Sequence, residues 1–269
     1  MMNTELVSII MPTYNTKEHL SQSIESILSQ TYPHFELLIT DDHSSDHHTI
    51  ETIKHYASID PRVKPFFLAH NQGAGCARNN AIERAQGRYI AFCDSDDCWL
   101  PYKLEEQLAF MKEKACALSC ASYIVCDSHY NEIGINIPPD IITFSMLKRD
   151  NKVGCLTAMY DVERLGRKFF MPTLRKRQDW GLFLLIVREC GKCYVYTKKP
   201  LAKYCTQEHS VSSDKLSLVK YNMAVYHTVL GYSQLKTFFY FFGIFMPTYV
   251  FKIIKRKLDS KRYRTKQKP

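Results

Sequence analysis

Three carboxylates, Asp94, Asp96 and Asp97, lie within four positions directly after the apolar run 89–93. Side chains alternate with a period of two along an extended chain, so Asp94 and Asp96 project to one side where a strand ends. Two ionised carboxylates that close repel each other, and a hard divalent cation relieves the repulsion. Such a cation, left partly open, can hold the phosphates of a nucleotide. An ordinary acidic turn or helix cap explains the same run, and the run alone does not separate the two interpretations.

Polar side chains also follow two other apolar runs. Pro12, Thr13 and Tyr14 follow residues 6–11, and Asp42 follows residues 35–40. Tyr14 offers a ring face on which a base can stack. A carboxylate at Asp42 can accept the imide N–H of uracil, a proton that neutral cytosine lacks. Capping and turn chemistry are the alternatives for these residues.

The residues between these motifs alternate between two periodicities. Short apolar runs typical of buried strands are separated by segments with apolar residues at helical spacing. This alternation predicts an α/β fold with a mostly parallel, doubly wound, Rossmann-like sheet, whose ligands bind at the carboxyl ends of the strands. The predicted strands are 6–11, 35–40, 63–68, 89–92 and 117–126, and the predicted helices are 20–28, 49–57, 76–85, 101–114, 180–189 and 215–230.

Composition favours a soluble globular protein. The chain has 269 residues with 45% hydrophobic content, enough for one large domain or two small ones. It contains ten cysteines, and residue 5 leads straight into a strand-like run with no secretory signal pattern. We therefore expect a reducing cytosol in which most of these cysteines are small buried residues.

The carboxyl-terminal part differs from the body. Residues 252–268 contain nine Lys or Arg and one acid, so nearly all of the net charge of +9 lies there. The fifteen uncharged residues 237–251 before them are rich in Phe and Tyr, but a bilayer span needs roughly 20 apolar residues, and Gly243 and Pro247 interrupt the run. We expect a catalytic domain at 1–231 and a helical, membrane-associating segment at 232–269 that binds an anionic surface. A core helix followed by a solvated tail is the alternative.

Five motifs, in order and at these spacings, resemble family 2 glycosyltransferases, which are inverting enzymes of the GT-A fold. The resemblance covers about residues 5 to 215, and within the family the bacterial enzymes of O-antigen and capsule synthesis are the most similar. The motifs are the run 7–15 (VSIIMPTYN), Thr40-Asp41-Asp42, Asn71-Gln72-Gly73 with Ala77-Arg78-Asn79, Asp94-Ser95-Asp96-Asp97, and Gln178-Asp179-Trp180.

The resemblance implies a role for each matched position. Asp179 is the expected catalytic base, although an N-terminal helix cap would explain it too. Asp96, with Asp94 nearer the ribose or a metal-bound water, is expected to hold Mn²⁺ or Mg²⁺. Gln178 stands where many relatives have Glu, which leaves the role of that position open. The expected nucleotide-sugar-binding residues are Pro12, Thr13, Tyr14, Asp42, Arg78, Asp94, Ser95, Asp96 and His209, with a surface Arg and an exposed loop His as the alternatives for Arg78 and His209.

The function that the resemblance implies is metal-dependent, inverting transfer of a hexose, glucose or galactose, from a UDP-sugar. The expected acceptor is a saccharide on a polyprenyl diphosphate, the linkage β, and the location the cytoplasmic face of a bacterial membrane. A UDP-N-acetylhexosamine donor is the alternative within the class. A nucleic-acid-binding module acting through the basic tail is the alternative from another class, but such modules spread cations over a folded face.

A different constellation has zinc-site spacing. Cys190, Cys193, Cys205 and His209 follow the pattern C-x2-C-x11-C-x3-H. Ten cysteines make a chance match easy, and Cys193 begins a strand-like run whose side chains can face a core. Buried structural cysteines are the favoured interpretation.

Overall fold

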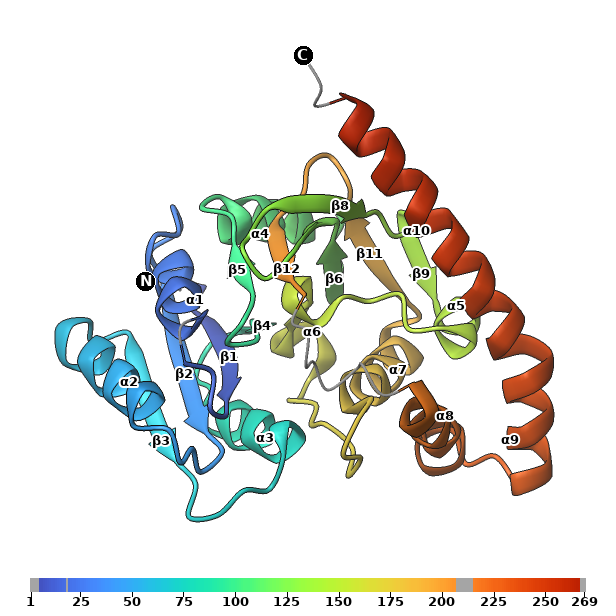
Figure 1. Cartoon of the computed structure of the whole chain (residues 1–269), viewed down its shortest axis with the longest axis horizontal. Coiled ribbons are helices and arrows are strands. Elements are labelled where there is room, and N and C mark those ends of the chain that lie inside the picture. The colour runs from blue at the N-terminus through green and yellow to red at the C-terminus, as the bar shows by residue number, and fades with distance from the viewer. Residues whose placement is uncertain (1–4, 18, 207–214, 267–269) are drawn as a thin grey trace.

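The computed structural model describes residues 5–17, 19–206 and 215–266. An eight-stranded sheet in the order β3-β2-β1-β4-β10-β6-β11-β9 forms the centre of the molecule, and a four-stranded sheet in the order β5-β12-β7-β8 lies beside it. Helices α1, α2 and α3 accompany the amino-terminal half of the large sheet, and α7 to α10 lie with its carboxyl-terminal half (Figure 1). The predicted α/β fold is confirmed.

The amino-terminal half of the large sheet is entirely parallel. Strands β1 and β2 have seven buried residues each, as expected of central strands covered on both faces. Helix α1 buries Leu20, Ile24 and Ile27, which share one helical face. These elements are β1 (Val7–Thr13), α1 (His19–Leu28), β2 (Phe35–Asp41), α2 (His47–Ile59), β3 (Val63–Phe67), α3 (Ala74–Arg84) and β4 (Tyr89–Phe92).

Beyond β4 the sheet is mixed. Strand β10 (Met159–Asp161) pairs antiparallel with both β4 and β6 (Leu118–Ala121), and β11 (Lys192–Tyr196) is parallel to β6. Strand β9 (Ile141–Thr143) closes the edge antiparallel to β11. The helices of this half are α4 (Lys103–Glu113), α5 (Phe144–Arg149), α6 (Val162–Leu165), a 3₁₀ turn at Cys155–Thr157, and α7 (Gln178–Cys190).

The predicted strand at 117–126 is two strands in different sheets. Strand β6 belongs to the large sheet, whereas β7 (Tyr123–Cys126) pairs with β8 (Glu132–Asn136) and β12 (Ala202–Cys205) in the small one. At the break, the Ser122 N–H donates to the Tyr196 carbonyl and the Ser122 carbonyl accepts from the Leu201 N–H. Because the strands on both sides are mostly apolar and largely buried, the sequence pattern carries no sign of this bend. Strand β5 (Cys98–Trp99) completes the small sheet.

The carboxyl-terminal helices pack against the body rather than standing apart. Helix α8 (Lys215–Ala224) continues in a π-helical turn (Val225–Val229), and Gly231 at φ +68° ends it at the predicted domain boundary. Helix α9 (Gln234–Tyr240), a second π-helical turn (Phe241–Phe245) and α10 (Met246–Lys266) follow. Phe241 and Phe245 are buried in the same core as Trp180 and Tyr226, so part of the predicted membrane-associating segment stabilises the body.

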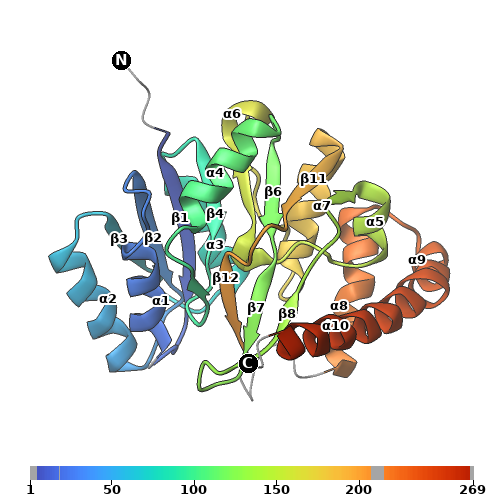
Figure 2. The same cartoon turned by 90° about the horizontal axis from the view of Figure 1, so that it is seen from above.

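Helix α10 lies along strand β8 (Figure 2). The Ser260 hydroxyl donates to the Ile135 carbonyl over 3.5 Å and accepts from the Ile135 N–H over 3.3 Å. The approach is close enough to require Gly134, where a Cβ would lie 2.3 Å from the Ser260 hydroxyl oxygen. By length and composition alone, the helical segment Gln234–Arg262 could also cross a membrane, and 17% of its most apolar window is buried.

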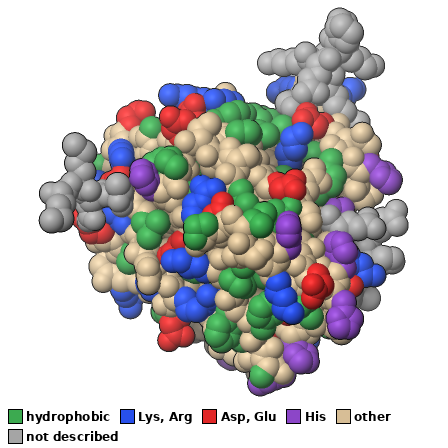
Figure 3. All heavy atoms as spheres, turned by 90° about the vertical axis from the view of Figure 1, so that its left-hand side faces the viewer, with side chains coloured by type: hydrophobic (Ala, Val, Ile, Leu, Met, Phe, Trp, Pro, Cys, Tyr) green, Lys and Arg blue, Asp and Glu red, His purple; other side chains and the backbone are tan. Residues whose placement is uncertain are grey.

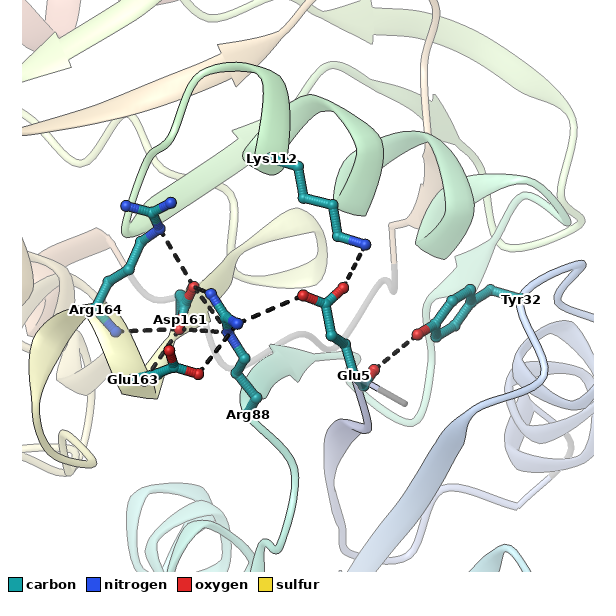
Figure 4. A network of polar contacts seen from close by, with 7 residues as sticks. All are labelled: Glu5, Tyr32, Arg88, Lys112, Asp161, Glu163 and Arg164. Atoms are coloured by element: carbon teal, nitrogen blue, oxygen red, sulfur yellow. Dashed lines mark hydrogen bonds and ion pairs between the residues drawn. The ribbon is translucent and has the colours of Figure 1, made fainter. Parts of the chain in front are cut away.

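A polar network holds the amino ends of the central strands, at the edge of the sheet away from the acidic run. Arg88, just before β4, contacts Asp161 over 2.8 Å, Glu163 over 3.0 Å and Glu5 over 3.5 Å. Asp161 is buried and also accepts from the first backbone amides of α6. Glu5 in turn bonds Lys112 of α4 and accepts from the Tyr32 hydroxyl through its carbonyl (Figure 4). The network joins β1, β4, β10 and α4 and leaves the opposite strand ends open for a site.

The surface over α1, α2 and β3 has mixed charge. Lys and Arg side chains alternate there with Asp and Glu and with small apolar areas (Figure 3). This agrees with a nearly neutral body whose excess of positive charge lies in the carboxyl-terminal segment.

Candidate active site

The acidic run lies at the carboxyl end of β4 as predicted. The Asp97 N–H donates to the Asp94 carbonyl, which forms a tight turn, and the Asp97 carboxylate accepts from the Cys205 N–H over 3.2 Å. Asp97 is therefore a buried link to the small sheet, and burial raises its pKa well above the usual value. Ser95 is buried and shares a hydrogen bond of 2.8 Å with Thr16. Thr16 shares a second one of 3.0 Å with Thr13, so the ends of β1 and β4 are joined.

Arg78 connects the acidic run to helix α3. It lies in the second turn of that helix, is buried, and donates from Nη2 to Asp94 Oδ1 over 2.5 Å. Burial alone would lower its pKa, but the charge of Asp94, with a smaller contribution from Asp179, raises it instead. The Nε atom of Arg78 is buried with no hydrogen-bond partner among the described residues. Arg78 is thus a permanent cation between the two carboxylates, not an arginine on an open surface.

Asp96 is partly buried beside Asp94, and its pKa is raised. Burial and the nearby charge of Asp94 raise its pKa to about 6. The two side chains therefore lie close enough to interact, but across the turn at 94–97 and not along an extended strand, which the period-two argument assumed. A pair of carboxylates suits a hard cation such as Mg²⁺ or Mn²⁺, with phosphate oxygens and water as the remaining ligands. Among the described residues no group of three or more His, Cys, Asp or Glu side chains could hold a metal, so this pair would depend on those additional ligands.

The predicted nucleotide-binding residues lie at the ends of β1 and β2. Pro12 and Thr13 are buried, whereas Tyr14 is 51% exposed and leaves a ring face open for stacking. Asp42 is only 2% exposed, and its two carboxylate oxygens accept from the Gln72 and Gly73 amides, each over 2.7 Å. Asp42 thus holds the loop that leads into α3, and its contact with uracil stays a prediction. The Asp41 carboxylate accepts from the Ser44 amide and hydroxyl and so closes the turn that follows β2.

Asp179 lies in the first turn of α7 and does not cap it. The N-cap is Arg177, without a side-chain cap and at φ +65°, a strained conformation for a residue with a Cβ. The Asp179 carboxylate instead accepts from Asn151 Nδ2 over 3.0 Å. Trp180 next to it is buried, donates from its indole N–H to the Leu147 carbonyl over 2.8 Å, and holds the start of the helix in the core. The first residue of the predicted motif, Gln178, is buried against Gly75.

A cavity of about 610 Å³ brings together Asp94 and Asp179, two of the predicted site residues. Asp94 and Asp97 line one part of it, Asp179 and Asn151 another, and helix α10 a third. The residues from α10 are Thr248, Phe251, Lys252, Lys255 and Asp259, and the remaining wall includes Tyr123, Tyr204, Lys152, Cys155 and Arg177. Asp94 of the acidic run and the half-buried Asp179 with its amide donor thus face one open space, whereas Arg78 and Asp96 do not line it. Arg78 is joined to this space through its ion pair with Asp94.

Sequence reasoning did not find several of these residues. Asn151 and Lys152 lie in a loop with no recognisable motif, and Lys255 reaches the cavity only because α10 packs beside it. Arg177 also lines the cavity, and the sequence indicates this only through its position directly before the Gln178-Asp179 pair. The predicted donor residue His209 lies outside the described residues.

The cysteines of the zinc-like spacing are not brought together. Cys193 on β11 faces Cys120 at 3.8 Å, whereas Cys205 on β12 lies in the other sheet. Cys190 donates its thiol to the Lys192 carbonyl. The favoured interpretation of structural cysteines agrees with this placement.

The fold and the site define a nucleotide-sugar transferase of the GT-A class, and comparisons with known proteins agree. Residues 8–179 match the family described as Glycosyl transferase family 2. The chain is 38% identical over 225 residues to the putative teichuronic acid biosynthesis glycosyltransferase TuaG of Bacillus subtilis, covering 83% of this chain and 88% of TuaG. It is 35% identical to WfgD of Escherichia coli, described as a UDP-Glc:alpha-D-GlcNAc-diphosphoundecaprenol beta-1,3-glucosyltransferase, covering 81% of this chain and 84% of WfgD. The chain belongs to glycosyltransferase family 2.

Solved structures show the same fold at low sequence identity. TarS of S. aureus has a TM-score of 0.62 at 18% identity, covering 86% of this chain, which spans 41% of the length of TarS. The mannosyltransferase PcManGT of Pyrobaculum calidifontis, solved with GDP-Man and Mn²⁺, has a TM-score of 0.62 at 15% identity, covering 86% of this chain and 65% of that one. The resemblance to GT-A glycosyltransferases is therefore confirmed in both sequence and fold.

Proposed function

We propose that this chain transfers a hexose from a UDP-sugar, UDP-glucose or UDP-galactose, to a saccharide on a polyprenyl diphosphate, and that the product is β-linked. The observation that carries the proposal is the shared cavity, in which Asp94 of the acidic run and Asp179 of α7 both face the same space. Similarity to WfgD, whose description names UDP-Glc and a diphosphoundecaprenol-linked sugar, supports this choice of substrates.

The donor end is built for a nucleoside diphosphate. Tyr14 offers a stacking face for the base, and Ser95 and Thr13 fix the strand ends around it. Asp94 and Asp96 fit Mn²⁺ or Mg²⁺, which when bound neutralises charge on the departing diphosphate. Arg78 forms an ion pair with Asp94 and adds a fixed positive charge in the same region. We infer that His209 also contacts the donor.

The acceptor end supplies the base. Asp179 removes the proton from the acceptor hydroxyl while the hydroxyl oxygen forms a bond to the anomeric carbon of the donor sugar. The bond from that carbon to the diphosphate oxygen breaks at the same time, and the diphosphate leaves. Because the oxygen enters on the face opposite the leaving group, the configuration inverts. Asn151 Nδ2 holds one carboxylate oxygen, which leaves the other free to accept the proton. We place the enzyme on the inner face of the bacterial membrane, where a lipid-linked acceptor and a cytosolic UDP-sugar meet.

The test is a transfer assay with the purified full chain. GlcNAc-diphosphoundecaprenol is the acceptor, and UDP-glucose, UDP-galactose and UDP-N-acetylglucosamine compete as donors with Mn²⁺, with Mg²⁺ or with a chelator. We expect a hexosylated product whose NMR coupling constant shows a β-linkage, formed only with a divalent cation. An α-linked product, transfer only from UDP-N-acetylglucosamine, or full activity with the chelator would contradict the corresponding part of the proposal.

A further inference from the structure

Helix α10 forms one wall of the catalytic cavity. Thr248, Phe251, Lys252, Lys255 and Asp259 all line it, and their spacing of three and four residues places them on one face of the helix. The helix is also tied to the base. Lys252 Nζ donates to the Asn151 carbonyl over 2.6 Å, and the Asn151 side chain donates to Asp179. A segment that the sequence suggested as a membrane anchor thus contributes directly to the space beside the base.

This part of the cavity has a surplus of positive charge. Lys152, Arg177, Lys252 and Lys255 line it. Lys152 and Lys252 share one buried acid, Asp150, at 3.5 and 3.0 Å. No ion pair of Arg177 or Lys255 occurs within the described part of the chain, and the Nε atom of Arg177 is buried without a hydrogen-bond partner there. Asp179 and Asp259, the latter one turn after Lys255, are acids that line the same part of the cavity. With Asp150, three acids face these four cations, and an anion that contacts Arg177 and Lys255 would pair with the two cations that have no ion pair among the described residues.

An apolar stripe borders the same wall. Phe251, Ile254 and Leu258 are 73%, 50% and 53% exposed, and their spacing places them along one side of α10, next to the line of Lys255. Exposed apolar rows beside a cationic row are typical of helices that lie at a lipid surface. The ligand that matches both rows carries adjacent phosphate charges and a hydrocarbon chain.

We propose that Arg177 and Lys255, supported by Lys252, bind the diphosphate of the lipid-linked acceptor, and that its hydrocarbon chain leaves the cavity across Phe251, Ile254 and Leu258. This inference rests on the proposed function, because it assigns the acceptor to that same cavity. The sugar at the other end of the diphosphate then points toward Asp179. The donor diphosphate has a separate cation, Arg78, beside the acidic run.

The test measures binding of farnesyl diphosphate, a water-soluble isoprenoid diphosphate, to the full chain in the absence of donor. Lys255→Gln removes one charge from the proposed site, and we expect about tenfold weaker binding, as for loss of one charge-assisted hydrogen bond. The matched control is Lys257→Gln, which makes the same change two residues further on. Each residue turns a helix by about 100°, so Lys257 points to nearly the opposite side and should leave the affinity unchanged. Farnesol should bind both variants and the parent chain equally.

Four results would overturn the inference. Equal losses in the Lys255 and Lys257 variants would show a general attraction to a basic helix, and no loss in either would show that the diphosphate binds elsewhere. A matching loss of UDP affinity in Lys255→Gln would assign this wall to the donor. The farnesyl diphosphate binding assay involves no turnover, so it tests this inference even if the chain does not transfer a hexose from a UDP-sugar. Conversely, normal transfer to the lipid-linked acceptor with an unchanged KM in Lys255→Gln would reject only this inference.

Discussion

Asn151 donates from Nδ2 to Asp179 Oδ2 over 3.0 Å, and the carbonyl of the same Asn151 accepts from Lys252 Nζ over 2.6 Å. One loop residue therefore joins the proposed base on α7 to the carboxyl-terminal helix α10. The side-chain contact orients the Asp179 carboxylate, and the backbone contact fixes where the loop lies relative to α10.

Asn151→Ala should lower kcat by about tenfold to a hundredfold with little change in the KM for the UDP-sugar, because the base loses its orienting hydrogen bond but keeps its charge. Steady-state kinetics with both substrates varied would show this. Asn136→Ala is the control, since Asn136 lines the same cavity and has no hydrogen bond to Asp179. Equal effects of the two substitutions would mean that Asn151 contributes only to the shape of the cavity.

Asp179→Asn should lower kcat by about 10²–10⁴-fold while the affinity for UDP stays the same, because an amide cannot accept the acceptor's proton. Single-turnover transfer measured beside UDP binding separates the two effects. Asp179 lies in the first turn of α7, so a small loss of stability from the helix dipole is also expected. A variant that transfers normally when saturated but binds UDP poorly would show that the base lies elsewhere.

Asp96→Asn should weaken Mn²⁺-dependent binding of UDP at least tenfold, because the site loses one of its two carboxylate ligands. Titration of UDP into the full chain, with Mn²⁺ and then with a chelator, would measure the dependence. Asp60→Asn serves as the control, since Asp60 pairs with Arg62 at the end of α2. Equal UDP affinity for parent and Asp96→Asn in Mn²⁺ would remove Asp96 from the metal site.

The parts of the structure that the sequence predicted are those determined by local pattern. Strands β1 and β2 are long, buried on both faces and followed by helices with a clear apolar side, so their order and type could be derived. Strand β10 has three residues, Met159–Asp161, and no apolar run, so its antiparallel insertion between β4 and β6 left no pattern to read.

The site residues also divide into those that a local sequence pattern predicted and those that depend on tertiary contacts. Asp94, Arg78 and Asp179 belong to motifs at strand ends and helix starts, and the structure places all three around one region. Asn151 is 28 residues from Asp179 and acts through a contact between a loop and a helix, which no local pattern reports. The role of α10 as a cavity wall depends on how Gly134 and Ser260 let it approach β8, a tertiary relationship between distant segments.

Lys103→Met should stabilise the protein. Lys103 is fully buried over the Trp99 ring at 3.6 Å, and its ammonium has no hydrogen-bond partner among the described residues. Burial lowers its pKa to about 7, partly offset by Cys93. The unfolded chain therefore binds more protons between about pH 7 and the usual lysine value, and folding is least favoured at the acidic end of that window. We expect a gain on the order of 3 kcal/mol at pH 7, after the lost cation–π contact is subtracted.

Urea unfolding at pH 7 and at pH 9.5 would check the sign. The difference in unfolding free energy between Lys103→Met and the parent should narrow at the higher pH. Above pH 7 the folded lysine is neutral, and the free energy needed to remove its proton on folding falls as the pH approaches the usual lysine pKa. Lys112→Met, at an exposed position of the same helix, should show no such narrowing. A gap independent of pH would show that Lys103 keeps its charge in the folded protein.

The phenylalanines of the segment from α9 to the second π-helical turn should divide into two functional groups. Phe238 and Phe242 are half exposed and in contact with each other, whereas Phe241 and Phe245 are buried in the core with Trp180. Replacing both exposed rings by Ser should leave the free energy of unfolding almost unchanged but weaken binding to anionic vesicles about tenfold, because two apolar groups no longer enter the lipid interface. Replacing Phe241 or Phe245 by Ser should instead cost about 3–5 kcal/mol of stability.

Urea unfolding and vesicle sedimentation of the same samples would separate these outcomes. The exposed and the buried phenylalanines lie within one stretch of eight residues, 238–245, and both sets are replaced by Ser. Each set of variants is therefore the control for the other. Sedimentation of the Phe238/Phe242 variant equal to that of the parent would show that these rings do not anchor the protein. Salt-sensitive binding that persists after their removal would then place the attraction on the basic residues of α10, since each cation near an anionic surface contributes roughly 1 kcal/mol.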